Sequence, residues 1–330
     1  MRIDEFRELL RHYDADRLRE IAAELYKALP KDKKTPELDK TLRAFTKGSK
    51  LVAPRAAVVD FDELAAQVEE FLENANEGLY FQPNRVIPKA RRTKWRFEAR
   101  RLIKGLIAAR GEDSEAAAQL LLQVYNMLSH ACAVYIFPTD SPFSAVGYRQ
   151  SELLGLALEK LLSLGVTPES AELAVCTTLA SYEDRETWHL SLLDSLVGAL
   201  KTNPAKEAAR EVAKGFPQAY ERYRQSRRLF RLANDGWTLK GNRDRAVELY
   251  LMLSLALSEP DQGIAYYRRH YKGPHAEGKL YILLSHFLND PDLSDYWIRE
   301  YESAVAAGTK PRDSIRQEYA ARLSARPNPA

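Results

Sequence analysis

Residues 249–261 read L-Y-L-M-L-S-L-A-L-S-E-P-D, and residues 280–292, which begin 31 positions later, read L-Y-I-L-L-S-H-F-L-N-D-P-D. Seven positions are identical in the two copies: Leu249/Leu280, Tyr250/Tyr281, Leu253/Leu284, Ser254/Ser285, Leu257/Leu288, Pro260/Pro291 and Asp261/Asp292. A period of about 20 to 50 residues indicates stacked supersecondary units, and this one has the length of a single helix–turn–helix hairpin. The repeat therefore predicts an α-helical array.

Proline marks the expected starts of several further helices. It is tolerated at the first helical position because the N–H that it lacks has no partner inside the helix. A Thr, Asn or Asp directly before it can cap the helix with a side-chain oxygen. Six prolines precede helix-length stretches: Thr35-Pro36, Thr167-Pro168, Asn203-Pro204, Glu259-Pro260, Asp290-Pro291 and Lys310-Pro311. In four of them the preceding residue is Thr, Asn or Asp. Because each precedes a stretch rich in strong helix formers and strand signals are nearly absent, the chain is predicted to be all-α.

The pattern predicts helices along the whole chain. They cover 3–29, 35–46, 60–76, 89–109, 113–136, 149–164, 168–182, 187–201, 204–214, 217–233, 243–258, 261–272, 276–289, 291–307 and 311–324. The clearest loop is 138–147, and we place a domain boundary there. The predicted domains are an N-terminal helical region, 1–137, and a C-terminal helical repeat array, 148–325, followed by a frayed tail, 326–330.

The C-terminal segment resembles HEAT-like or TPR-like arrays in its period and hairpin pattern, over roughly residues 187–307. Leu192, Leu196 and Leu200, followed by Pro204, echo the repeat with one residue inserted. The TPR consensus, with its Trp, Gly and Ala positions at a period of about 34 residues, is not met. The predicted fold is therefore a divergent array of helical hairpins that follows an N-terminal helical region.

Composition indicates a globular protein in a reducing compartment. Of the 330 residues, 45% are hydrophobic and 29% charged, and the net charge is +3, which argues against global disorder and against a surface that is basic throughout. No stretch approaches about 18 apolar residues, and no apolar segment follows Met1, so neither a membrane span nor a signal peptide is expected. Cys132 and Cys176 lie in apolar stretches without a CxxC spacing. A cytosolic location is expected.

The sharpest local feature is a reversal of charge within a predicted hairpin, 60–109. Residues 58–84 contain seven acidic and no basic residues, whereas residues 85–104 contain nine basic residues and one acid, Glu98. On a helical wheel, one apolar stripe of the basic helix comprises Trp95, Ala99, Leu102, Ile103 and Leu106. The candidate binding residues of the opposite side and the preceding turn are Arg92, Lys94, Arg96, Phe97, Arg100, Arg101 and Lys104.

The charged hairpin has two interpretations. In the first, the helices pair in antiparallel fashion, and ion pairs along their seam neutralise the basic side. In the second, the basic side stays open and binds a polyanion, such as nucleic acid, or an acidic protein. Cations would then meet phosphates, and the ring of Phe97 would stack on an exposed base.

A second concentration of basic and aromatic residues lies at 222–245, and a shorter one at 266–272. The candidate binding residues of the stretch 222–245 are Arg224, Arg227, Arg228 and Arg231, with Tyr223, Phe230 and Trp237 interspersed. These stretches could form one surface, because each hairpin of an array presents an equivalent face. The alternative is that the aromatic residues belong to the core with a polar tip at its edge, and that solvated arginines flank them.

The sequence contains no convincing active site. Gly-rich phosphate loops and the Gly-x-Ser-x-Gly elbow are absent. Glu186 and His189 have the Glu-x-x-His spacing of di-iron bundles, but no second such motif occurs, and a capped helix start is favoured. His130, two residues before Cys132, is interpreted as a core histidine. Neither a metal nor a cofactor is expected.

Function is predicted from these surfaces. The expected role is that of a non-enzymatic interaction or adaptor protein, which binds a macromolecular partner, expected to be a protein, along its helical surface. The alternative is an array that binds nucleic acid through the basic–aromatic faces at 85–104 and 222–245. An enzyme built on His189 or His130 is a third hypothesis, from a different class.

Overall fold

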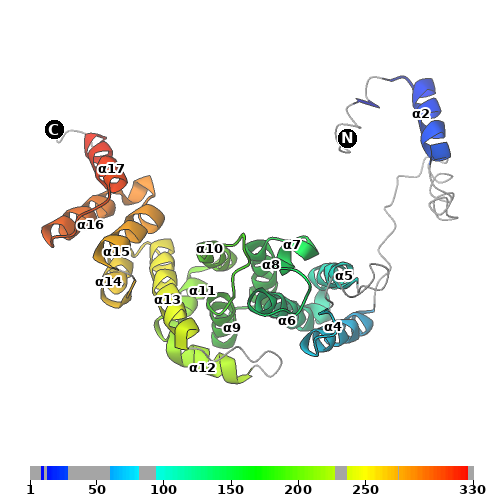
Figure 1. The fold of residues 1–330 in the computed structure, drawn as a ribbon, viewed down its shortest axis with the longest axis horizontal. Coiled ribbons are helices and arrows are strands. Elements are labelled where there is room, and N and C mark those ends of the chain that lie inside the picture. Colours follow the sequence, from blue (N-terminus) through cyan, green and yellow to red (C-terminus); the bar gives the residue numbers. More distant parts are fainter. Residues whose placement is uncertain are drawn as a thin grey trace. The chain divides into compact units, whose positions relative to one another are not determined.

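A computed structural model describes residues 9–10, 13–28, 60–81, 94–226, 236–273 and 275–325. The chain divides into two compact units, Met1–Val59 and Asp60–Ala330. In the first unit, α2 (Ala15–Ala28) carries i,i+3 ion pairs such as that between Arg17 and Glu20, at 2.7 Å. Every regular element among the described residues is helical (Figure 1), which confirms the prediction of an all-α protein. None of these helices is long and apolar enough to cross a membrane.

The second unit begins with four helices around an aromatic cluster. They are α4 (Phe61–Asn76), α5 (Trp95–Ala108), α6 (Ser114–Ala133) and the short α7 (Pro142–Val146), with a 3-10 turn at Gly111–Asp113. The rings of Trp95 and Phe137 stack with centroids 3.9 Å apart, and Phe71 lies 6.2 Å from Phe137. The cluster joins α4, α5 and the segment after α6.

The middle of the unit consists of helices that pack on neighbours close in sequence. They are α8 (Gln150–Leu162), α9 (Pro168–Leu179), α10 (His189–Ala199), α11 (Asn203–Lys214), α12 (Phe216–Ser226) and α13 (Gly236–Ala256). Helix α8 packs against α6 and α10, whereas α11 packs against α9 and α13. Neighbouring helices therefore alternate between two sets, α6–α8–α10 and α9–α11–α13 (Figure 1).

The C-terminal helices contain the second copy of the sequence repeat and the end of the first, whose larger part lies in α13. They are α14 (Pro260–His270), α15 (Ala276–Ile282), the π-helix η4 (Leu283–Phe287), the 3-10 turn η5 (Pro291–Leu293), α16 (Ser294–Ala306) and α17 (Asp313–Ser324). In the first copy, α13 ends before Ser258, which has φ 61°. In the second copy, the helix predicted over 276–289 changes into the π-helix. The two copies therefore share a sequence pattern but differ in local helix geometry.

Most of the proline signals mark helix starts as predicted. Pro168 begins α9, whose cap Thr167 accepts a hydrogen bond at its Oγ1 from the N–H of Ser170, at 3.1 Å. Pro260 and Pro291 likewise begin α14 and η5. The helix predicted over 243–258 was wrong at its start, because α13 begins at Gly236. Two of the predicted starts at proline were also wrong in detail.

Helix α11 begins one residue earlier than predicted, because Thr202 rather than Asn203 caps it. Helix α17 begins at Asp313, two residues after Pro311. The site at Thr35-Pro36 and the helix predicted over 35–46 lie outside the described residues.

One continuous hydrophobic core runs through the second unit, from Leu64 to Ile315. The loop predicted over 138–147 was wrong for Pro142–Val146, which form α7 inside this unit; α7 packs against α5 and α6 and buries Phe143 completely. The predicted division into 1–137 and 148–325 stays a prediction, and the tail 326–330 lies outside the described residues.

Candidate functional site

Helices α4 and α5 face each other with their apolar sides. All five residues of the predicted apolar stripe of α5 are buried, as are Leu64, Val68, Phe71, Leu72 and Ala75 on α4. The contact is close at Gly105, where an added Cβ would lie 2.9 Å from Cδ2 of Leu64. The seam between the helices is therefore apolar, and their charged side chains are left to the outer sides.

Ion pairing along this seam, as the first interpretation of the charged hairpin predicted, was wrong for the described residues. No acidic side chain of 60–77 lies within 4.0 Å of a cation in the described part of α5 or its cap Lys94. The helices are instead linked by a hydrogen bond from Nη2 of Arg101 to Oε1 of Gln67, at 2.6 Å. Burial raises the pKa of the Glu98 carboxyl; Arg101 lowers it, and Glu70 raises it further.

The basic side of α5 is open to solvent. We call the exposed residues Lys94, Arg96, Phe97, Arg100, Arg101 and Lys104 the α5 basic face. The ring of Phe97 is 67% exposed, and the guanidinium carbon of Arg96 lies 5.9 Å from its centroid. The α5 basic face thus presents an exposed aromatic ring among cations that form no ion pair with any described residue.

Arg100 differs from the rest of this face because it lies over the end of α7. Gly147 caps α7 with φ 80°, and an added Cβ there would lie 2.7 Å from Nη2 of Arg100. The left-handed conformation and the close approach both favour glycine at this position. Helix α7 thus supports one edge of the α5 basic face.

Replacing Gly147 by alanine is expected to lower the free energy of unfolding by about 1–2 kcal/mol, because a left-handed backbone is strained by a Cβ. The matched control is Gly198→Ala, in the exposed part of α10 where an added Cβ meets no atom within 4 Å. That change should instead raise stability by roughly 0.5–1 kcal/mol. Urea unfolding followed by circular dichroism measures both, and a Gly147→Ala protein as stable as the parent would contradict this account of the turn.

The other predicted binding residues do not extend this face among the described residues. Arg92, Arg227, Arg228 and Arg231 lie outside the described residues, and Arg224 belongs to α12. In the second basic stretch, Arg222 pairs with Glu172, and Arg245 pairs with Glu183.

The aromatic residues of the second and third stretches belong to the core where their side chains are described. Tyr223 is buried, and its hydroxyl lies 3.2 Å from Oγ1 of Thr177. Tyr267 is also buried, and its hydroxyl donates to the carbonyl of Lys279, at 3.2 Å. For these two tyrosines the interpretation as core residues with a polar tip is confirmed.

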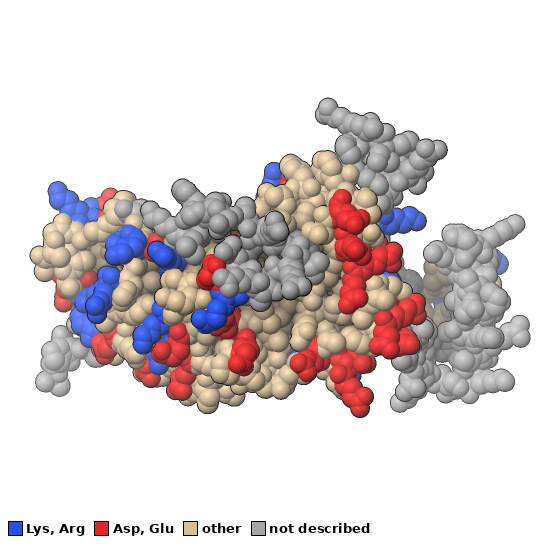
Figure 2. Space-filling view, turned by 90° about the horizontal axis from the view of Figure 1, so that it is seen from below, with Lys and Arg blue, Asp and Glu red and all other residues tan. Residues whose placement is uncertain are grey.

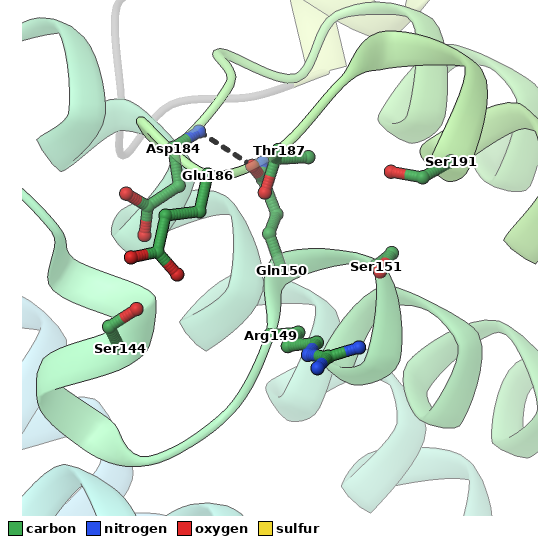
Figure 3. Close-up of a pocket in the computed structure, with 8 residues that line it drawn as sticks. All are labelled: Ser144, Arg149, Gln150, Ser151, Asp184, Glu186, Thr187 and Ser191. Atoms are coloured by element: carbon green, nitrogen blue, oxygen red, sulfur yellow. Dashed lines mark hydrogen bonds between the residues drawn. The ribbon is translucent and has the colours of Figure 1, made fainter.

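A polar cavity of about 320 Å³ lies between the start of α8 and the segment before α10 (Figure 3). Its lining residues are Ser144, Arg149, Gln150, Ser151, Asp184, Glu186, Thr187 and Ser191. In Figure 3 the carboxylates of Asp184 and Glu186 point toward Ser144, whereas the guanidinium of Arg149 points away from them. The cavity therefore has one acidic wall.

The buried groups of this cavity already have partners within the fold. Oε1 of Gln150 accepts from the N–H of Asp184, at 2.7 Å (Figure 3). Its Nε2 donates to the carbonyl of Tyr182, at 2.8 Å. The carboxylate of Asp184 accepts from the N–H groups of Phe143 and Arg185. These bonds fix the segment 181–187 against α8 and α7, which is a structural role.

His189 takes part in a pair that sequence reasoning did not predict. Its Nε2 lies 2.9 Å from Oε2 of Glu248, a residue of α13 that is 3% exposed. The interpretation with Glu186 on the same helix face was wrong, because α10 begins at His189 and Glu186 lies in the preceding turn. Trp188 also reaches the π-helix, with its ring 4.8 Å from that of His286. The start of α10 is thereby attached to α13 and η4.

The structure does not support chemistry at His130 and Cys132. Burial raises the pKa of the Cys132 thiol to about 12, so that the nucleophilic thiolate is scarce at neutral pH. Burial lowers the pKa of His130. No group of three or more His, Cys, Asp or Glu side chains within the described ranges is arranged to hold a metal ion.

Sequence reasoning thus located the α5 basic face but missed the Gln150–Asp184 bonds and the His189–Glu248 pair. These partners are 34 and 59 positions apart, and no spacing rule connects them. Neither a protein-family model, nor a curated protein, nor a solved structure matches this chain.

Proposed function

We propose that this protein is a non-enzymatic helical interaction protein, and that the α5 basic face binds a macromolecular partner that carries negative charge. The observation behind the proposal is that Arg96 and Lys104 are exposed and form no ion pair within the described part of the chain, with a 67% exposed Phe97 on the same face. Interfaces of this kind take their energy from a few anchors, often aromatic or Arg side chains, inside a polar rim. An acidic protein surface could pair with the exposed cations Arg96 and Lys104 and cover the exposed ring of Phe97.

The scaffold in this proposal is a divergent array of helical hairpins over 148–325. The alternating contacts of α8 with α10 and of α9 with α11 support it, since stacked hairpins contact their sequence neighbours. A cytosolic location belongs to the same proposal. Cys132 and Cys176 are both free thiols, as is usual in a reducing compartment.

Nucleic acid is a second candidate partner, and the position of Phe97 favours it. A ring that projects from a helix next to a guanidinium, with further cations on the same face, offers both stacking for a base and contacts for phosphates. Binding of this kind weakens steeply with salt because phosphate contacts release counterions.

A charge-reversed variant, Arg96→Glu/Lys104→Glu, is expected to lose at least tenfold in affinity for the partner. The control is Arg269→Glu/Lys310→Glu, which changes the net charge equally at exposed cations that have no ion pair among the described residues. Two measurements test the proposal: quantitative capture of protein partners by the parent and both variants, and fluorescence anisotropy with labelled single- and double-stranded DNA and RNA over a salt series.

A protein or nucleic acid that the parent and the control bind, and the α5 variant does not, supports the proposal and identifies the class of partner. The proposal is wrong if all bound molecules are retained equally by the two variants. It is also wrong if the parent binds neither protein nor nucleic acid at low salt.

A further inference from the structure

Helix α4 has an acidic outer side that meets no counter-charge among the described residues. We call its exposed residues Asp62, Glu63, Glu69, Glu70, Glu73 and Glu77 the α4 acidic face. None of these carboxylates lies within 4.0 Å of a cation among the described residues. In Figure 2 Asp and Glu side chains gather toward the α4 end of the second unit.

Like charges on the outer sides of α4 and α5 lower the stability of the isolated α4–α5 hairpin. Glu69 and Glu73 are four positions apart on one helix, as are Arg96 and Arg100 on the other, and like charges at this spacing repel. The packing of α4 on α5 does not relieve this repulsion, because the close contact at Gly105 lies between the apolar sides of the two helices. Neither excess of charge meets its complement among the described residues, and each would gain from one on another molecule.

A second copy of the same chain supplies both complements at once. We propose that the protein forms a homodimer in which the α4 acidic face of one copy binds the α5 basic face of the other. In a two-fold symmetric pair the same contact forms twice, since one hairpin carries both faces. This inference rests on the proposed function, because it names the partner of the α5 basic face.

Phe97 and the ion pairs contribute in different ways. The exposed ring offers apolar area at the contact, which salt does not weaken. Exposed ion pairs are individually weak and screened by salt, so the dimer depends on several of them together. We therefore expect association that is strongest at low ionic strength.

Sedimentation equilibrium of the parent protein tests this first. Between about 1 M and about 0.01 M salt the Debye length grows from about 3 Å to about 30 Å. The weight-average mass should rise over this range from about the monomer mass of 37.5 kDa toward twice that value. A mass that stays monomeric at low salt overturns the inference.

A charge swap then tests which surfaces meet. In Arg96→Glu/Lys104→Glu the formal charge of the α5 basic face falls from +5 to +1, and in Glu69→Lys/Glu73→Lys that of the α4 acidic face falls from −6 to −2. Each variant alone is therefore expected to associate more weakly than the parent at low salt. An equal mixture of the two should regain the dimer mass, because the acidic faces of the first variant meet the basic faces of the second.

A variant that dimerises as tightly as the parent, or a mixture that associates no more tightly than either variant alone, would overturn the proposed contact. The control Arg269→Glu/Lys310→Glu should dimerise like the parent. Failure of the dimer leaves the proposed function testable by itself. If the parent is monomeric but captures a protein or nucleic acid through the α5 basic face, only this inference fails, whereas a dimer without any other partner identifies self-association as the use of that face.

Discussion

Replacing Gln150 by leucine is expected to lower the free energy of unfolding by about 2–4 kcal/mol, because a buried polar group left without a partner costs about 1–3 kcal/mol. Gln150 is 1% exposed and serves three partners: the N–H of Asp184, the carbonyl of Tyr182 and the hydroxyl of Tyr125, at 2.7, 2.8 and 3.3 Å. Leucine has a similar size but can bond none of them.

The three partners of Gln150 do not lose the same number of hydrogen bonds in the leucine variant. The carbonyl of Tyr182 also accepts from Oγ of Ser129, and the hydroxyl of Tyr125 lies 2.9 Å from Oγ of Ser181, so both keep one bond. The N–H of Asp184 has no other acceptor among the described residues and stays buried. Most of the expected loss therefore arises at Asp184, whose carboxylate in turn binds the N–H of Phe143 at the start of α7.

Urea unfolding followed by circular dichroism measures this effect. Gln119→Leu is the matched control, because Gln119 is an exposed residue of α6, and its replacement should change stability by no more than about 0.5 kcal/mol. A Gln150→Leu protein that loses less than about 1 kcal/mol would show that water satisfies the N–H of Asp184 in the variant.

Replacing Trp95 by alanine is expected to cost about 3–5 kcal/mol, the usual range for the loss of a large buried aromatic side chain. Trp95 is 4% exposed, and its ring stacks on Phe137 at 3.9 Å with an interplanar angle of 17°. Its removal leaves a cavity where α5 meets the segment after α6. Helix α5 would then lose its fixed position, and binding by the α5 basic face should weaken with it.

Phe97→Ala is the control for this change, on the same helix and two positions away. Because Phe97 is 67% exposed, its replacement should change stability by no more than about 0.5 kcal/mol while weakening binding of a partner. Thermal unfolding combined with the binding assay separates the two effects. The account of α5 is wrong if Trp95→Ala is as stable as Phe97→Ala, or if Phe97→Ala keeps full binding.

The apolar and basic sides of α5 could be predicted from the sequence, because helical periodicity depends only on residues that are close together in the chain. The apolar stripe from Trp95 to Leu106 is buried as predicted, and the cations around Phe97 are exposed. For the described residues, the interpretation with ion pairs between the oppositely charged helices was wrong for a physical reason. Burial of two apolar stripes stabilises more than exposed ion pairs do, and the stripes decide which sides of the helices meet.

Contacts between residues that are far apart in the sequence leave no pattern in it comparable to helical periodicity. Nothing in the spacing of His189 and Glu248 indicates that they meet, because their contact depends on how α10 and α13 pack. The π-helix in the second repeat copy is a similar case, since its sequence matches a copy that stays α-helical up to Ala256.

By itself the sequence determined the helical class, most helix bounds and the charge of the α5 basic face, because these depend on the period of about 3.6 residues and on capping residues. Only the tertiary structure decided that the α4 and α5 charges do not neutralise each other, that Gln150 holds Asp184, and that His189 binds Glu248. Those outcomes depend on which apolar surfaces pack together, and packing is a property of the whole chain and not of any segment.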